Sequence, residues 1–220
     1  MSTTTPSTSL TEATVDMRAG LRSQLGEETL AALDRDAVAL GAGDTFAPAL
    51  DVGSRAPLFT LPDARGGEVA LEELLTRGPV VLVFYRGAWC PYCNLQLAAF
   101  QGALADIEAA GGTLVAVSPQ TPDQSLSFAE QRALDFPVLT DASNGVAGAY
   151  GLAYTASSVA TSTLRELGVE LSSFNGDDTN KLPAAATFVI GQDGRIRFAS
   201  VSGDYRWRVG PEEVLAVLGG

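Results

Sequence analysis

The sequence predicts an α/β fold in which a mixed central sheet is flanked by helices on both faces. Two observations carry this prediction. Short runs of β-branched, apolar residues alternate with helical patterns through the middle of the chain, which is typical of parallel strand–helix–strand units. A hairpin pattern and a final helical pattern then follow near the C-terminus, so an antiparallel strand is expected to join the sheet.

Length and composition limit the organisation of the chain. With 220 residues, it is long enough for one sizeable domain and an appendage. Residues 1–45 are predicted to be a tail and a helical extension, and residues 46–220 to be the main domain. The net charge is −12, and such an acidic surface disfavours binding to nucleic acid or to an anionic membrane. No run of apolar residues is long enough to predict a transmembrane helix.

The N-terminal segment begins with a polar tail. Residues 1–9 have neither a basic residue nor an apolar core, so we do not expect a secretory signal. Between Leu10 and Leu40 the apolar residues recur at helical spacing, and Gly26 followed by Glu27 indicates that one helix ends and another begins there. These helices are expected to pack on the main domain or on a second subunit, in which case the chain would form a homodimer.

The first half of the main domain reads as a hairpin followed by a strand–helix–strand unit. Gly66-Gly67 predicts a turn between two short strands, and the apolar runs predict strands that are buried on both faces. Gly111-Gly112 is a stop signal for the helix that begins near Cys90. The expected elements are strands 57–61 and 68–71, a short helix 71–77, a strand 80–85, a helix from 90 to about 110, and a strand 113–118.

The second half of the main domain is less regular. A polar helix is expected over residues 121–134, a strand over 136–139 and a short helix over 144–150. Residues 151–181 are predicted to be mostly irregular, and the Asp- and Asn-rich loop 174–180 reads as solvated because it lacks the rest of a calcium-binding pattern. The hairpin turn 191–194 joins strands 186–190 and 195–201, and a closing helix begins at Pro211.

Both cysteines of the chain lie where the central strand meets the helix that follows it. Cys90 and Cys93 are spaced i and i+3, and Pro91 fits the first helical position. The N-terminus of a helix stabilises a thiolate, so we expect Cys90 to have a lowered pKa and to meet solvent and substrate. Cys93 is one turn further along and is expected to attack a sulfur-linked intermediate on Cys90. Arg86 is the cation expected beside the sulfur atoms.

Redox chemistry is favoured over the other uses of a Cys-x-x-Cys pair. A zinc site needs two further nitrogen or sulfur ligands, and the chain has no histidine and no third cysteine. The same absence excludes Ser-His and Cys-His catalytic systems. We therefore expect no metal and no cofactor. Two cysteines three residues apart cannot staple a fold, which indicates a reducing, cytoplasmic location.

The order of elements around these cysteines resembles the thioredoxin-like fold. More narrowly, residues 50–218 resemble the peroxiredoxin-like branch of the alkyl hydroperoxide reductase and thiol-specific antioxidant (AhpC/TSA) family. The matching segments, in chain order, are Ala56-Pro57-x-Phe59-x-Leu61, Val81 to Tyr85, Arg86-Gly87-x-Trp89-Cys90-Pro91-Tyr92-Cys93, Val117-Ser118-Pro119-Gln120, Phe136-Pro137-Val138-Leu139-Thr140-Asp141, and Thr187-Phe188-Val189-Ile190 with Asp193-Gly194.

The resemblance implies a thiol peroxidase. By it, Cys90 reduces hydrogen peroxide or an organic hydroperoxide and becomes a sulfenic acid, and Cys93 condenses with that acid to form a disulfide. Thioredoxin or a similar dithiol would then reduce the disulfide. Arg86 would assist catalysis, and the substrate pocket would include Gly87, Trp89, Pro91 and Tyr92.

The chain departs from the family pattern at three positions. Gly87 stands where typical members have Thr or Ser, Val83 where they have Pro, and Ala185 where many have an arginine. Arg86, with Arg206 or Arg208 as a second cation, is expected to replace that arginine. Two other functions remain open at this point: a thioredoxin-like dithiol–disulfide oxidoreductase that does not act on peroxide, and a binding module with incidental cysteines.

Overall fold

A five-stranded mixed sheet forms the centre of the protein. The structure is a computed structural model that describes residues 10–220, so the predicted tail 1–9 lies outside the described residues. The strand order is β5-β4-β3-β8-β9, in which β3, β4 and β5 are parallel and β8 and β9 are antiparallel to their neighbours. The strands are β3 Val80–Phe84, β4 Thr113–Ser118, β5 Val138–Thr140, β8 Ala185–Ile190 and β9 Ile196–Ser202. The predicted mixed sheet is confirmed.

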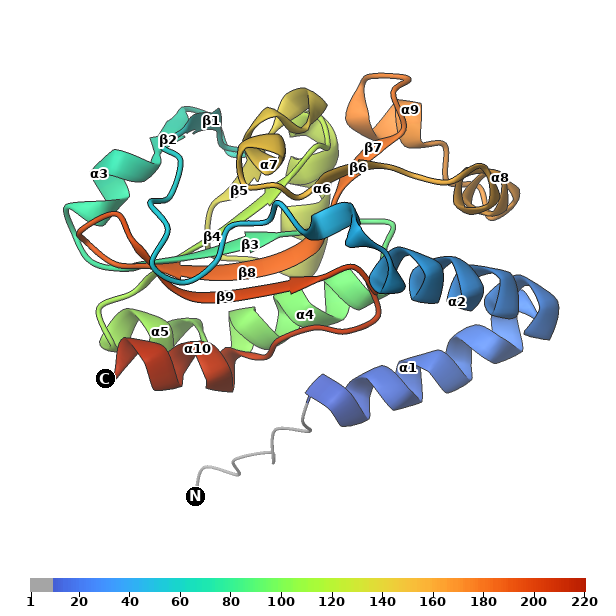
Figure 1. Ribbon diagram of the computed structural model, residues 1–220, viewed down its shortest axis with the longest axis horizontal. Coiled ribbons are helices and arrows are strands. Elements are labelled where there is room, and N and C mark those ends of the chain that lie inside the picture. Colours follow the sequence, from blue (N-terminus) through green and yellow to red (C-terminus); the bar gives the residue numbers. More distant parts are fainter. Residues whose placement is uncertain (1–9) are drawn as a thin grey trace.

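Helices cover both faces of this sheet (Figure 1). The helices α4 Pro91–Gly102, α5 Leu104–Ala109 and α10 Pro211–Leu218 lie on one face, and α3 Leu71–Leu75, α7 Gly145–Ala149 and the hairpin of β1 Thr60–Pro62 and β2 Glu68–Ala70 lie on the other. Every residue of β3 is buried, and its side chains alternate between the two cores: Val81 and Val83 face one, Leu82 and Phe84 the other. The helix α6 Pro122–Arg132 packs beside β5.

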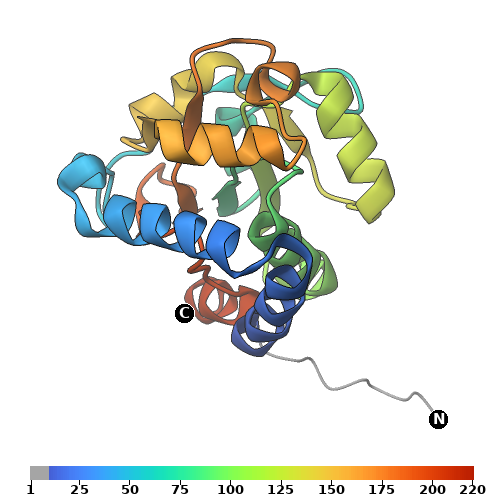
Figure 2. The ribbon, with the colours of Figure 1, turned by 90° about the vertical axis from the view of Figure 1, so that its right-hand side faces the viewer.

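Two N-terminal helices extend this fold and pack on it. They are α1 Leu10–Leu25 and α2 Glu27–Ala42, and they meet at Gly26, whose φ of +79° suits a glycine. A short 3₁₀ turn, Asp44–Phe46, follows them. Figure 2 shows α1 beside α4, and α2 beside the helix α8 Ser158–Glu166. The predicted helical extension and its break at Gly26 are confirmed.

Three expectations about the main domain need correction. The helix predicted from Cys90 to about residue 110 is two helices, α4 and α5, which meet at Ala103. The first strand, expected over residues 57–61, is Thr60–Pro62. Residues 151–181 are more regular than predicted, since they include β6 Ala153–Thr155, α8, α9 Leu171–Asn175 and β7 Lys181–Pro183.

The Ser- and Thr-rich composition of α8 explains why the sequence does not predict this helix. Ser157 caps it by accepting a hydrogen bond from the backbone N–H of Ala160 at 3.0 Å. Its apolar face is formed by few residues, chiefly Ala160 and Leu164, which are buried. Among the described residues, no helix is both long and apolar enough to cross a membrane.

Candidate active site

The sequence around the cysteines folds as a strand, a short loop and a helix start. Cys90 is the N-cap of α4 and Pro91 is its first residue, so Cys93 lies in the first turn. Both cysteines are free thiols. The expectation that Cys90 meets solvent is wrong, because Cys90 is 1% exposed and Cys93 is fully buried. The helices α1 and α2 and the loop after β9 cover this end of the domain.

Gly87 is held in a conformation that only glycine adopts easily. Its φ is +153°, and a Cβ at this position would collide with the indole nitrogen of Trp89 and lie 2.8 Å from Gln120 Oε1. The next residue, Ala88, donates its backbone N–H to that same Gln120 oxygen. The family's Thr or Ser therefore does not fit this loop, in which Trp89 takes the space beside Gly87.

The two thiols are coupled to each other, and their interaction favours the anion on Cys93. Burial, followed by this interaction, raises the pKa of Cys90 well above its ordinary value. Burial also opposes ionisation of Cys93, but the Cys90 thiol, Arg208 and the backbone N–H of Arg86 together hold the pKa of Cys93 well below its ordinary value. The predicted lowering of the Cys90 pKa is therefore wrong, and the pair's negative charge rests on Cys93.

Arg86 lies in the core of the site, as the sequence predicts for the cation near the sulfur atoms. It is 4% exposed, and its guanidinium carbon lies 3.9 Å from the Tyr205 ring centroid and 5.0 Å from that of Trp89. Burial disfavours its charge, but Tyr154, Cys90 and Tyr205 more than offset this, so the pKa of Arg86 stays above its ordinary value. Its Nε atom is buried without a hydrogen-bond partner among the described residues.

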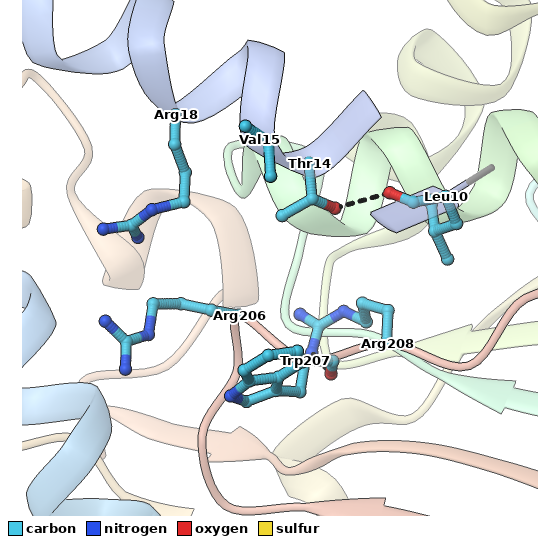
Figure 3. A pocket seen from close by; sticks show the side chains of 7 residues that line it. All are labelled: Leu10, Thr14, Val15, Arg18, Arg206, Trp207 and Arg208. Carbon is cyan, nitrogen blue, oxygen red and sulfur yellow. Dashed lines mark hydrogen bonds between the residues drawn. The ribbon is translucent and has the colours of Figure 1, made fainter. Parts of the chain in front are cut away.

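Arg208 is the second cation of the site. Its Nη2 atom lies 3.4 Å from the Cys93 sulfur. The loop after β9 that carries it also lines a cavity of about 290 Å³, in which Figure 3 shows Trp207 between the side chains of Arg206 and Arg208, with Arg18 reaching in from α1. Arg206, the other candidate, pairs instead with Asp204 at 2.5 Å and with Asp34 at 2.9 Å.

An apolar chamber of about 280 Å³ opens over Cys90. Trp89, Pro91 and Tyr92 line it, whereas Gly87, the fourth predicted pocket residue, does not. Most of its wall is aliphatic and comes from α1, α2 and the segment that begins with α8. The aliphatic lining residues are Leu21, Leu25, Leu30, Leu33, Ala160, Leu164, Leu167 and Val169.

Polar contacts fasten the N-terminal helices to this chamber. Arg18 of α1 donates to the hydroxyl of Tyr92 at 2.8 Å and forms an ion pair with Asp34 of α2 at 2.6 Å. The hydroxyl of Tyr205 donates to the Leu33 carbonyl at 2.9 Å. Both aromatic rings that flank Cys90 are thus tied to residues outside the main domain.

Sequence reasoning missed three contributors to the site. Gln120 follows β4, and its position is readable in principle, because the carboxyl ends of adjacent parallel strands meet at one edge of a sheet. Tyr205 and the leucines of α1 and α2 carry no such signal, since a loop and an appended helix pair place them over Cys90.

The arrangement favours nucleophilic attack on an electrophile that binds at Cys90. A thiol with an anionic thiol beside it can attack an electrophile while its proton passes to the neighbour. Cys90 is the N-cap residue of α4 and Cys93 lies in its first turn, which is the Cys-x-x-Cys arrangement of redox-active disulfides. Two cations stabilise the negative charge that both steps develop.

One family model and several curated proteins match this chain. The AhpC/TSA family model matches residues 52–199. The chain is 36% identical over 136 residues to the putative peroxiredoxin Rv2521 of Mycobacterium tuberculosis, covering 62% of this chain and 84% of that protein. It is 33% identical over 104 residues to peroxiredoxin Bcp of Escherichia coli K12, covering 47% and 65%.

Solved structures share the fold. The crystal structure of peroxidoxin BcpB from Mycobacterium tuberculosis has a TM-score of 0.60 and 26% identity, covering 77% of this chain and 96% of that chain. A peroxiredoxin-like protein from Aquifex aeolicus has the same TM-score at 18% identity, covering 79% and 88%, which shows the fold alone. The helices α1 and α2 precede the residues that the family model matches.

Proposed function

The chain belongs to the AhpC/TSA family and is a thiol-dependent peroxidase, and from this premise we propose that Cys90 is the peroxidatic thiol and Cys93 the resolving thiol. The observation that supports this assignment most is that Cys90, the N-cap residue of α4, lines the chamber, whereas Cys93 lies one turn further along with Arg208 Nη2 3.4 Å from its sulfur. The neighbouring Cys93 gives the buried nucleophile a local base in a site without histidine.

In the first step, Cys93 accepts the proton of Cys90, and the Cys90 thiolate attacks the terminal oxygen of a hydroperoxide. An S–O bond forms and the O–O bond breaks, so that sulfur is oxidised to a sulfenic acid. The alkoxide or hydroxide leaves with the proton that Cys93 received, as an alcohol or as water. Cys93 is then an anion again, with Arg208 beside it.

In the second step, the Cys93 thiolate attacks the Cys90 sulfur of the sulfenic acid. An S–S bond forms, the S–O bond breaks, and the hydroxide leaves as water with one proton from solvent. An external dithiol donor, for which thioredoxin is our proposal, reduces the disulfide by thiol–disulfide exchange and restores both thiols.

Arg86 has the catalytic role that a Thr or Ser hydroxyl and another arginine have in typical members of the family. Its guanidinium lies over the rings of Tyr205 and Trp89, and its Nε–H is buried without a partner among the described residues. A peroxide oxygen would accept that hydrogen bond. Because the negative charge on the leaving oxygen grows as the O–O bond breaks, the contact strengthens in the transition state.

Peroxide consumption tests this function. The reduced wild-type protein, mixed with hydrogen peroxide and a thioredoxin system, should turn over. Cys90→Ser should remove turnover completely. Cys93→Ser should consume about one equivalent at a much lower rate and hold a sulfenic acid that a dimedone probe labels. If the wild type consumes no peroxide but reduces insulin disulfides, the dithiol–disulfide oxidoreductase function is correct instead.

A further inference from the structure

The cavity between α1 and the loop after β9 lies outside the chamber over Cys90. Its volume of about 290 Å³ is close to the lower end of ordinary small-molecule sites, which is about 300 Å³. Three of the chain's 14 basic residues line it, namely Arg18, Arg206 and Arg208 (Figure 3). None of the described lining residues is acidic, so the wall favours an anion.

Two of these arginines are paired with carboxylates. Arg18 forms an ion pair with Asp34 at 2.6 Å. Arg206 forms ion pairs with Asp204 at 2.5 Å and with Asp34 at 2.9 Å. Two carboxylates thus balance two guanidinium charges and hold both side chains in place. The net charge of the cavity therefore depends on the third arginine.

Arg208 faces the sulfur of Cys93. Its Nη2 atom lies 3.4 Å from that sulfur, and its Nη1 atom donates to the Trp207 carbonyl at 3.2 Å. Its Nε atom is buried without a hydrogen-bond partner among the described residues. In the reduced protein the Cys93 anion balances the charge of Arg208, whereas a disulfide between Cys90 and Cys93 carries no charge. In the disulfide form, two carboxylates therefore face three arginines.

We propose that this cavity binds a small organic carboxylate, and that it binds the carboxylate more tightly when the two cysteines form a disulfide. The inference rests on the proposed disulfide chemistry of the cysteine pair. The ligand's carboxylate meets Arg208, whose planar guanidinium suits two parallel hydrogen bonds to it. The ligand's apolar body lies against Leu10, Val15 and Trp207, which line the cavity. The side chains of Val15 and Trp207 are 63% and 67% exposed, so they are accessible to a ligand.

Benzoate tests the site, and benzamide is the matched control ligand because it has the same ring without the charge. Diamide converts the reduced protein to the disulfide form without peroxide, and isothermal titration calorimetry measures binding to each form. Benzoate should bind the disulfide form about tenfold more tightly than the reduced form. Benzamide should bind the disulfide form much more weakly than benzoate does. Equal benzoate affinities of the two forms, or equal affinities for benzoate and benzamide, would overturn the inference.

Two substitutions locate the ligand. Arg208→Gln should abolish the difference in affinity between the two redox forms, because it removes the charge that the disulfide leaves without an anion. Val15→Asp puts a carboxylate on the wall and should weaken benzoate binding to the disulfide form about tenfold. Arg132→Gln and Val38→Asp are the matched controls, since both residues are exposed and lie away from the cavity, and they should change neither affinity. Benzoate binding that neither Arg208→Gln nor Val15→Asp alters would place the ligand elsewhere and overturn the inference.

Ligand binding and redox state are linked in both directions. A ligand that binds the disulfide form tenfold more tightly must make the disulfide tenfold harder to reduce. Saturating benzoate should therefore lower the equilibrium constant for reduction by dithiothreitol about tenfold, which corresponds to about 30 mV for this two-electron couple. In the reduced protein, benzoate competes with the Cys93 anion for Arg208, so it should also slow peroxide reduction. A reduction equilibrium that saturating benzoate does not move would overturn the coupling.

Reduced Cys93→Ser protein separates this inference from the proposed function. Serine is uncharged at neutral pH, so Arg208 has no anion beside it even without oxidation. This variant should bind benzoate as tightly as the disulfide form of the wild type does. Such binding, in a chain whose wild type turns over no peroxide, would refute the proposed function alone. If the variant binds benzoate no more tightly than reduced wild type, the inference fails whatever the peroxidase activity is.

Discussion

Arg208 is the residue whose loss should move the charge of the cysteine pair most. Its guanidinium lies 3.4 Å from the Cys93 sulfur. A hydrogen bond to a charged group contributes about 1.5–3 kcal/mol, and one pH unit of pKa corresponds to about 1.4 kcal/mol. Arg208→Ala should therefore raise the pKa of Cys93 by about one to two pH units. Thiolate absorbance against pH measures this, and Arg132→Ala, an exposed arginine on α6, should not change it.

The pH dependence of peroxide reduction follows from the same contact. The pKa of Cys93 is lowered, so the pair keeps its anion at pH values below the ordinary cysteine pKa of about 8.5. The rate constant with peroxide should fall only as the pH drops through the lowered pKa. In Arg208→Ala this acid limb should move to higher pH. An unmoved limb would mean that Cys93 is not the base.

Gly87 cannot be exchanged for the family's threonine without loss. The positive φ and the contact with Trp89 both oppose a Cβ at this position. Strain of this kind costs about 1–3 kcal/mol, and overpacking adds to it. Gly87→Thr should lower the free energy of unfolding by about 2 kcal/mol or more in denaturant titrations. Gly148→Ala is the control, since an exposed helical glycine with open space around it should gain stability. A Gly87→Thr protein as stable as wild type would show that Trp89 does not fix this loop.

Among the elements, the α1–α2 pair depends on Asp34. This carboxylate accepts hydrogen bonds from Arg18 and Arg206, and although burial opposes ionisation, these partners hold the pKa of Asp34 below its ordinary value. Asp34→Asn removes the carboxylate that pairs with Arg18 and one of the two carboxylates that pair with Arg206, and should cost about 1–3 kcal/mol. Asp16→Asn on the exposed side of α1 is the control and should cost far less.

The sign of the pH effect at Asp34 identifies its origin. A carboxylate whose pKa is lowered by folding stabilises the protein fully above the unfolded-state pKa, which is about 3.9. That stabilisation is lost as the pH falls through the folded-state pKa. The difference in unfolding free energy between wild type and Asp34→Asn should therefore be large at pH 7 and shrink below about pH 4. A difference that persists in acid would indicate a packing effect.

The elements that the sequence predicts well are those with strong local signals. The apolar strand runs 80–85, 113–118, 186–190 and 195–201 and the Cys90–Pro91 helix start are local, and they appear within about one residue of their expected places. The helix α8 has a short apolar face among serines and threonines, and it is completed only by packing against α2. The division between α4 and α5 at Ala103 is marked in the sequence only by Gly102, and a single glycine within a helical pattern is a weak stop signal.

At the scale of the whole molecule, the site could be predicted only in part. The two cysteines and Arg86 are neighbours in sequence, so their proximity follows from one strand–helix junction. Arg208 and the leucines of α1 and α2 reach the same place from opposite ends of the chain. The anion on Cys93 depends on Arg208, which is remote from the cysteines in sequence. The helix N-terminus alone therefore predicts the anion on Cys90, and this prediction is wrong.

Because Arg208 contacts Cys93, the loop that carries Arg208 should change its contacts when the two cysteines are oxidised. When the sulfur atoms join, Cys93 becomes neutral and Arg208 loses its anion, while Arg206 in the same loop stays bound to Asp34 of α2. Trp207, between the two arginines, is 67% exposed. Its emission should differ between the reduced and oxidised proteins, and amide hydrogens from Asp204 to Gly210 should exchange faster after oxidation. A dithiol reductant would thus meet a loop surface that differs between the oxidised and the reduced protein.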